Sequence, residues 1–119
     1  MSLIANVTVG NSGTILTPSD GTTWTERTSG IPKELYGVTS GNGLFVTVGF
    51  FGTILTSPDG ITWTERTSGT WVYLRGVTYA SSAFVTVGKS GTILTSPDGT
   101  TWTSRTSGTS NELRGVTSR

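Results

Sequence analysis

Short runs of hydrophobic and β-branched residues recur along the whole chain, and clusters of Gly, Asn, Ser, Pro and Asp separate them. One stretch has four such runs in succession, at residues 35–40, 44–49, 53–57 and 62–67. Runs rich in Val, Ile, Thr, Phe and Trp and bounded by turn residues are typical of β-strands. No segment shows the helical spacing of apolar positions. The pattern therefore predicts an all-β protein whose strands follow one another as a four-stranded antiparallel meander.

The four-strand pattern is repeated at a fixed spacing of 39 residues. Residues 13–51 and 52–90 are identical at 24 of 39 positions. A period of about 40 residues with four strands per unit is what a β-propeller blade requires, whereas leucine-rich and ankyrin solenoids have shorter periods. Each first strand also contains a glycine, which suits the crowded strand beside a propeller axis. We therefore expect β-propeller blades, with a stacked β-solenoid as the alternative. The glycines are Gly37, Gly76 and Gly115.

The two ends of the chain cut the repeat out of phase. Within a single repeat domain over residues 1–119, residues 35–67 and 74–106 each form a complete blade. Residues 5–28 supply only the second to fourth strands of a blade, and the first strand of a blade stands at residues 113–118. Three blades cannot close a ring, because propellers typically have about four to eight. The unpaired strand edges of an open fragment would also invite aggregation.

We therefore expect the strand at residues 113–118 to complete the split blade of another copy of the chain. Two copies would form a closed six-bladed ring, and three copies would form a ring of nine blades. The homodimer is the preferred prediction because six blades lie inside the usual range. The homotrimer is the alternative.

The turn between the third and fourth strands is the second repeated feature. It reads SPDGITW at residues 57–63, SPDGTTW at residues 96–102 and, slightly altered, PSDGTTW at residues 18–24. Asp followed by Gly is a strong turn signal, because Gly tolerates positive φ, Asp bonds nearby backbone amides, and Trp can cover the hairpin. We interpret the repeated residues as structural turn residues. They are Asp20, Asp59, Asp98, Trp24, Trp63 and Trp102.

SPDGITW and its copies resemble the Asp-box, the Ser, Asp, Gly, Thr, Trp turn motif of BNR-type β-propeller repeats in sialidases and sortilin-like receptors. The usual motif has one residue between Asp and Gly, whereas here Asp59 directly precedes Gly60. The chain therefore resembles an Asp-box-like group and not the sialidases proper. The resemblance covers all three copies, and it implies a structural box on the face away from an active site. A metal-binding or catalytic role of the aspartates is the alternative. The high identity between copies fits recent amplification of one blade or a designed protein.

Functional residues are expected where the copies differ most. These places are the turns between the second and third strands and the connections between blades, which share one face of a ring. On that face we expect the aromatic residues to pack between blades or between chains. The alternative is a ligand-binding site, because aromatic rings beside a guanidinium group can stack on a sugar and bond its hydroxyl groups. The candidate ligand-binding residues are Phe50, Phe51, Trp71, Tyr73 and Arg75.

Composition removes several classes of function. The chain has neither Cys nor His, which excludes disulfides, thiolate metal sites and His-dependent catalysis. Eight basic and seven acidic residues give a net charge of +1 without a basic cluster, so we expect no nucleic-acid partner. No apolar run reaches the roughly 20 residues of a membrane span, so we expect no membrane partner.

We expect no cofactor, no metal and no enzymatic activity. Glu34 and Glu112 both lie in connections between blades and could form a carboxylate pair across an oligomer. The sequence thus predicts a non-enzymatic β-propeller module that assembles with itself into a closed ring. A lectin-like propeller that binds glycans in the loops between blades is the alternative.

Overall fold

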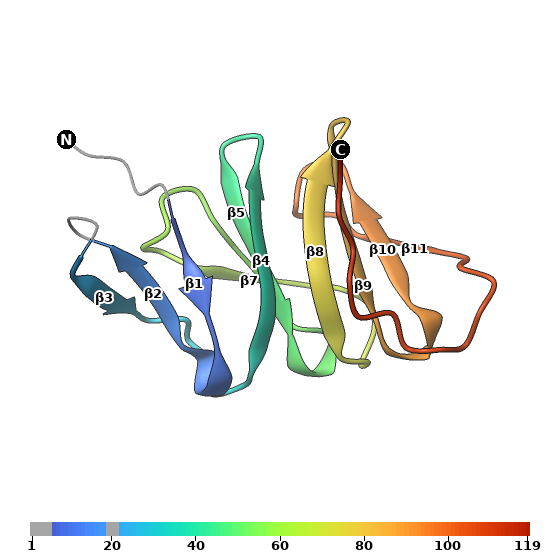
Figure 1. Cartoon of the computed structure of the whole chain (residues 1–119), viewed down its shortest axis with the longest axis horizontal. Coiled ribbons are helices and arrows are strands. Elements are labelled where there is room, and N and C mark those ends of the chain that lie inside the picture. Colours follow the sequence, from blue (N-terminus) through green and yellow to red (C-terminus); the bar gives the residue numbers. More distant parts are fainter. Residues whose placement is uncertain (1–5, 19–21) are drawn as a thin grey trace.

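The chain folds into three antiparallel β-sheets that stand side by side (Figure 1). The computed structural model describes residues 6–18 and 22–119. The first sheet contains β1 (Thr8–Val9), β2 (Ile15–Pro18) and β3 (Trp24–Arg27). The second contains β4 (Leu35–Gly41), β5 (Leu44–Gly49), β6 (Ile54–Ser57) and β7 (Thr64–Arg66). The third contains β8 (Leu74–Ala80), β9 (Ala83–Gly88), β10 (Ile93–Ser96) and β11 (Thr103–Arg105). Short 3-10 turns separate the strands at η1 (Asn11–Gly13), η2 (Phe50–Gly52) and η3 (Lys89–Gly91). The expected all-β meander is confirmed over the described residues.

Two strands of the second sheet begin later than the sequence predicts. β6 begins at Ile54, because Thr53 caps the preceding 3-10 turn and its amide donates to the carbonyl oxygen of Phe50 at 3.1 Å. β7 begins at Thr64, because the amide of Thr62 donates to the Asp59 carboxylate inside the turn at 3.0 Å. Both differences place residues in turns that the periodicity of side chains alone assigns to strands.

The sheets pack face to face through two apolar cores, because successive residues of a strand point to opposite faces. Ile54 of β6 belongs to the core shared with the third sheet, and its neighbour Leu55 belongs to the core shared with the first sheet. The second sheet is therefore covered on both faces. Buried residues of the larger core are Val46, Val48, Ile54, Leu74, Val77, Phe84 and Leu94. Those of the smaller core are Ile15, Leu35 and Leu55.

The first strands of neighbouring sheets lie close together through their glycines. A Cβ atom built on Gly37 of β4 would lie 3.2 Å from both the carbonyl oxygen of Arg75 and the Cα atom of Gly76 in β8. Each glycine carbonyl also accepts a hydrogen bond from a buried threonine of the next strand in its own sheet. Thr47 donates to Gly37 and Thr86 donates to Gly76, both at 2.7 Å. The glycines therefore allow the inner strands to approach, as the sequence pattern suggests.

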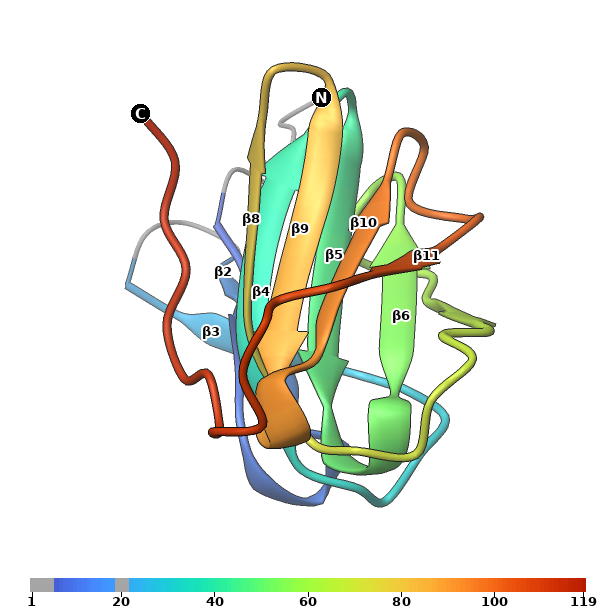
Figure 2. The ribbon, with the colours of Figure 1, turned by 90° about the vertical axis from the view of Figure 1, so that its right-hand side faces the viewer.

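Beyond β11, the last residues of the chain run alongside β8 (Figures 1 and 2). The hydroxyl group of Ser118 donates to the carbonyl oxygen of Tyr79 at 3.2 Å. The amide of Leu113 donates to the carbonyl oxygen of Gly88 at 2.9 Å, which reproduces the bond from Leu35 to Gly10 at 3.0 Å two repeats earlier. The segment therefore lies beside the third sheet as β4 lies beside the first. No described strand pairs with residues 113–118, so they form no strand themselves.

Candidate functional site

The aspartate of the second repeated turn is bonded within the turn itself. One carboxylate oxygen of Asp59 accepts hydrogen bonds from the amides of Ile61 at 2.9 Å and Thr62 at 3.0 Å. The Ser57 hydroxyl donates to the same oxygen at 3.1 Å and accepts from the amide of Gly60 at 2.7 Å. The indole nitrogen of Trp63 closes the hairpin by donating to the carbonyl oxygen of Gly60 at 3.0 Å. This arrangement uses the carboxylate as an acceptor for backbone amides.

The third repeat has the same set of bonds around Asp98. Its carboxylate accepts from the amides of Thr100 at 2.8 Å and Thr101 at 3.0 Å. Bonds from Thr101 and Thr100 lower the pKa of Asp98 below the ordinary value of 3.8, because they stabilise the ionised carboxylate. Bonds from the amides of Thr62 and Ile61 lower the pKa of Asp59 in the same way. Asp20 lies outside the described residues.

Replacing both aspartates by asparagine should lower the stability of the chain at neutral pH and flatten its dependence on acid. A lowered pKa means that the ionised turn contributes stability that is present above the ordinary value of 3.8 and is lost as the pH falls through the folded pKa. Thermal unfolding of the Asp59→Asn/Asp98→Asn variant between pH 7 and strongly acidic pH measures this. The exposed Glu65→Gln change is the control. An unchanged acid slope in the double variant would contradict this role for the turn.

Four of the five predicted ligand-binding residues form one cluster on the variable loops. The ring of Phe50 lies 4.3 Å from that of Phe51 and 4.7 Å from that of Tyr73, measured between centroids. The guanidinium carbon of Arg75 lies 5.2 Å from the Tyr73 centroid. The ammonium group of Lys89 lies 5.0 Å from the same centroid. Both cations therefore lie within the distance of a cation–π contact with Tyr73.

The fifth predicted residue, Trp71, takes no part in these ring and cation contacts and is 82% exposed. It lines an open groove of about 480 Å³ together with Phe51, which is 49% exposed. The groove runs along residues 65–70, which include Glu65 and Arg66 of β7. The first repeat has a corresponding groove of about 530 Å³ in which Ser12 and Pro32 stand at the equivalent positions. Of these two grooves, the one in the second repeat therefore has aromatic side chains where the one in the first repeat has Ser and Pro.

Phe51 has a backbone conformation that bulky residues rarely adopt. Its φ angle is +52°, in the left-handed region, and the equivalent residues Ser12 and Ser90 have φ angles of +59° and +58°. The turn itself thus requires this conformation in every repeat. A phenylalanine there carries backbone strain on the order of 1–3 kcal/mol without a buried side chain to offset it.

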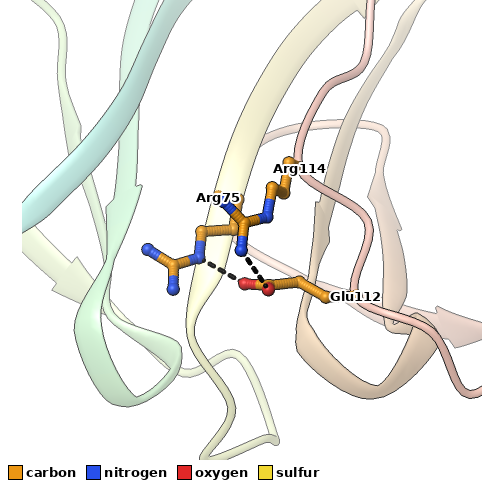
Figure 3. A network of polar contacts seen from close by, with 3 residues as sticks. All are labelled: Arg75, Glu112 and Arg114. Atoms are coloured by element: carbon orange, nitrogen blue, oxygen red, sulfur yellow. Dashed lines mark hydrogen bonds and ion pairs between the residues drawn. The ribbon is translucent and has the colours of Figure 1, made fainter.

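Sequence reasoning missed a network of charged residues at the start of the inner strands (Figure 3). The carboxylate of Glu112 contacts the Arg75 guanidinium at 2.7 Å and the Arg114 guanidinium at 3.1 Å. The bond from Arg75 lowers the pKa of Glu112, and the bond to Glu112 raises the pKa of Arg75. Arg114 stands one repeat after Arg75, which is the signal that could have drawn attention to them. Because Glu112 already contacts two cations, it is not available for the carboxylate pair with Glu34 that the sequence allowed.

The described residues contain no group of three or more His, Cys, Asp or Glu side chains that could hold a metal ion. None of the helices found in the described part of the chain is long and apolar enough to cross a bilayer.

The arrangement of the three sheets is shared with a solved structure. This chain is similar to the structure titled "YCF48 bound to D1 peptide", with a TM-score of 0.66 over 82% of this chain and 20% sequence identity. The fold is that of a β-propeller segment. The chain spans about a third of the similar protein's length, 34%. No family model matches the chain, and no curated protein matches its sequence. The propeller prediction is therefore confirmed as a fold, while membership of the Asp-box group stays a prediction.

Proposed function

We propose that this chain is a non-enzymatic structural and binding scaffold that closes with a second copy of itself into a six-bladed propeller. The observation that carries the proposal is the position of residues 113–118 beside β8, where a further blade would have its first strand, without any described strand paired to them. At the other end of the molecule, β2 is the only sheet neighbour that β1 has within residues 6–18 and 22–119. Each copy therefore offers the strand that the other lacks.

The burial of one repeated threonine supports this pairing. Thr47 and Thr86 are fully buried at 0% exposure and donate to Gly37 and Gly76 of the preceding strand. Thr8 stands one repeat earlier and is exposed. The equivalent acceptor for Thr8 is the carbonyl oxygen of Gly115, one repeat after Gly76 and at the other end of the chain. In the proposed ring that acceptor belongs to the second copy.

The two outer sheets also present apolar side chains that the middle sheet buries. Trp24 of the first sheet is exposed (46%), whereas its equivalents Trp63 and Trp102 are less exposed because each packs against one of the two cores. At the opposite end, Ile93 is half-buried, whereas the equivalent residues Ile15 and Ile54 have 0% exposure. Covering both faces requires the first sheet of one copy to pack on the third sheet of another. A head-to-tail contact of this kind avoids open fibres only when it closes into a ring.

The mass of the intact chain in solution tests the proposal. We expect a species of two 12.5-kDa chains, because a six-bladed ring has the usual number of blades. A species of three chains would identify the nine-bladed ring, which is the competing closure. A stable, folded single chain would contradict self-assembly altogether.

A second candidate function is carbohydrate binding in the groove between Phe51 and Trp71. The observation that favours it is the 82% exposure of Trp71 beside a strained and half-exposed Phe51. Packing does not require either aromatic ring, because the third repeat has Ser90 and Ser110 at these positions. Aromatic faces stack on the apolar face of a sugar ring, and polar groups among the lining residues 65–70 can bond its hydroxyl groups.

A glycan array compared between the intact chain and two variants tests this second function. Phe51→Ser and Trp71→Ser introduce the residues of the third repeat, so we expect glycan binding to fall at least about tenfold without loss of folding. Ile61→Thr is the matched control, because it also removes an exposed apolar side chain and introduces the residue of the third repeat. Absence of glycan binding by the intact chain, or equal binding by all variants, would leave only the scaffold function.

A further inference from the structure

Contacts in this molecule are repeated when both partners are moved by one repeat. The hydrogen bond from Thr47 to Gly37 recurs as Thr86 to Gly76 at the same distance of 2.7 Å. The turn bonds of Asp59 recur around Asp98. A residue shifted by one repeat can fall beyond the end of the chain. Because each chain holds three repeats, the equivalent residue then lies in the next copy, two repeats before the starting residue in the numbering. This rule allows contacts across the proposed ring to be read from contacts within one chain.

One contact of this kind joins the start of an inner strand to the connection that leads to the next blade. In the second sheet it is made by two aromatic residues, since the rings of Tyr36 and Tyr73 lie 6.2 Å apart. In the third sheet it is the ion pair of Arg75 and Glu112. Arg75 and Glu112 stand one repeat after Tyr36 and Tyr73, respectively. The two residue types thus change together from one repeat to the next.

We infer that Arg114 forms the third contact of this series with Glu34 of a second copy, an inference that rests on the proposed ring. Arg114 stands one repeat after Arg75, and Glu34 stands two repeats before Glu112. Arg114 and Glu34 have opposite charges, as Arg75 and Glu112 do. The two partners are therefore complementary at the junction between copies as well as inside the chain. Glu34 and Arg114 therefore complete the network at the closure, and neither copy contains the pair in place.

The state of the two side chains in a single chain agrees with this inference. Arg114 is 78% exposed and contacts Glu112 of its own chain, whereas Arg75 in the equivalent position is only 23% exposed. Glu34 is half-buried and makes no ion pair with a described residue. On closure Arg114 leaves the carboxylate of Glu112, which Arg75 already contacts. It pairs instead with the carboxylate of Glu34, which has no ion pair with a described residue of its own chain. Each guanidinium then has its own carboxylate.

Charge reversal tests the pair. Arg114→Glu and Glu34→Arg each place like charges at every junction of a homodimer, so we expect the dissociation constant of each variant to rise at least about tenfold. A chain with both changes should recover association. Co-expression of the two single variants with different affinity tags should yield the mixed dimer in preference to either homodimer, because one junction then has the native pair and the other has the reversed pair.

Lys33→Glu and Arg119→Glu are the matched controls, since they reverse exposed charges next to the same segments. Their association should stay within about threefold of that of the intact chain. If the intact chain forms a dimer but the single reversals associate as the controls do, or if the mixed dimer shows no preference, the pair is wrong and the ring stands. If the intact chain stays single, both the pair and the proposed function are overturned.

Discussion

A chain cut after Glu112 should be a single chain in solution if the intact chain closes into the proposed ring. The cut removes residues 113–119, which are the proposed first strand of the split blade at both junctions of a two-copy ring. The second and third sheets keep their strands and their shared core, since all of its buried members precede the cut. Sedimentation or light scattering measures the mass, and far-UV circular dichroism with tryptophan fluorescence measures whether the β-structure persists.

A tandem chain provides the complementary measurement. Met1 corresponds to Ser118 in the repeat, so joining Arg119 directly to Leu3 of a second copy continues the spacing of 39 residues without interruption. If two copies close the ring, this tandem chain should remain a single chain and should be more stable on dilution than the proposed dimer of separate chains, because its closure no longer depends on concentration. A tandem chain that associates further would favour nine blades. A truncated chain that keeps the mass of the intact assembly would contradict strand exchange.

The architecture could be predicted because its signals are local or strictly repeated. Strand runs with turn clusters between them predict the meander, and the spacing of 39 residues sets the number of sheets. The bonds that the Asp59 carboxylate accepts follow from residues within three positions of it. Such features depend on short segments whose conformation is determined by their own side chains.

The candidate site was less predictable because it depends on how neighbouring connections are placed. Tyr73 and Phe50 come together as expected, whereas Trp71, only two residues before Tyr73, lines the groove beside Phe51 and takes no part in their ring contact. No alternation rule applies in an irregular connection, so sequence spacing does not determine which side chains share a face. The pairing of Arg75 with Glu112 was missed for a related reason, since it requires knowing which part of the next repeat lies beside the inner strand.

A large loss of stability from a single substitution is expected at Gly52, in the 3-10 turn before β6. Its φ angle is +73°, and a Cβ atom there would lie 2.1 Å from the carbonyl oxygen of Thr70. That carbonyl belongs to the connection between the second and third sheets and accepts from the Ser68 hydroxyl at 3.2 Å. Gly13 and Gly91 have the same close approach in the other repeats, to Ile31 and Thr109. The glycine therefore lets the connection cross the turn.

Gly52→Ala should lower the free energy of unfolding by at least about 3 kcal/mol, the sum of a left-handed alanine and an overlap with backbone. Gly43→Ala separates the two causes, because Gly43 also has a φ angle of +73° but no atom lies within 4 Å of a Cβ atom built there. It should therefore cost only about 1–2 kcal/mol. Urea unfolding of both variants at one fixed protein concentration gives the comparison, since association would otherwise shift the midpoint. Equal losses at the two positions would show that conformation alone, and not the approach of the Thr70 carbonyl, makes glycine necessary in this turn.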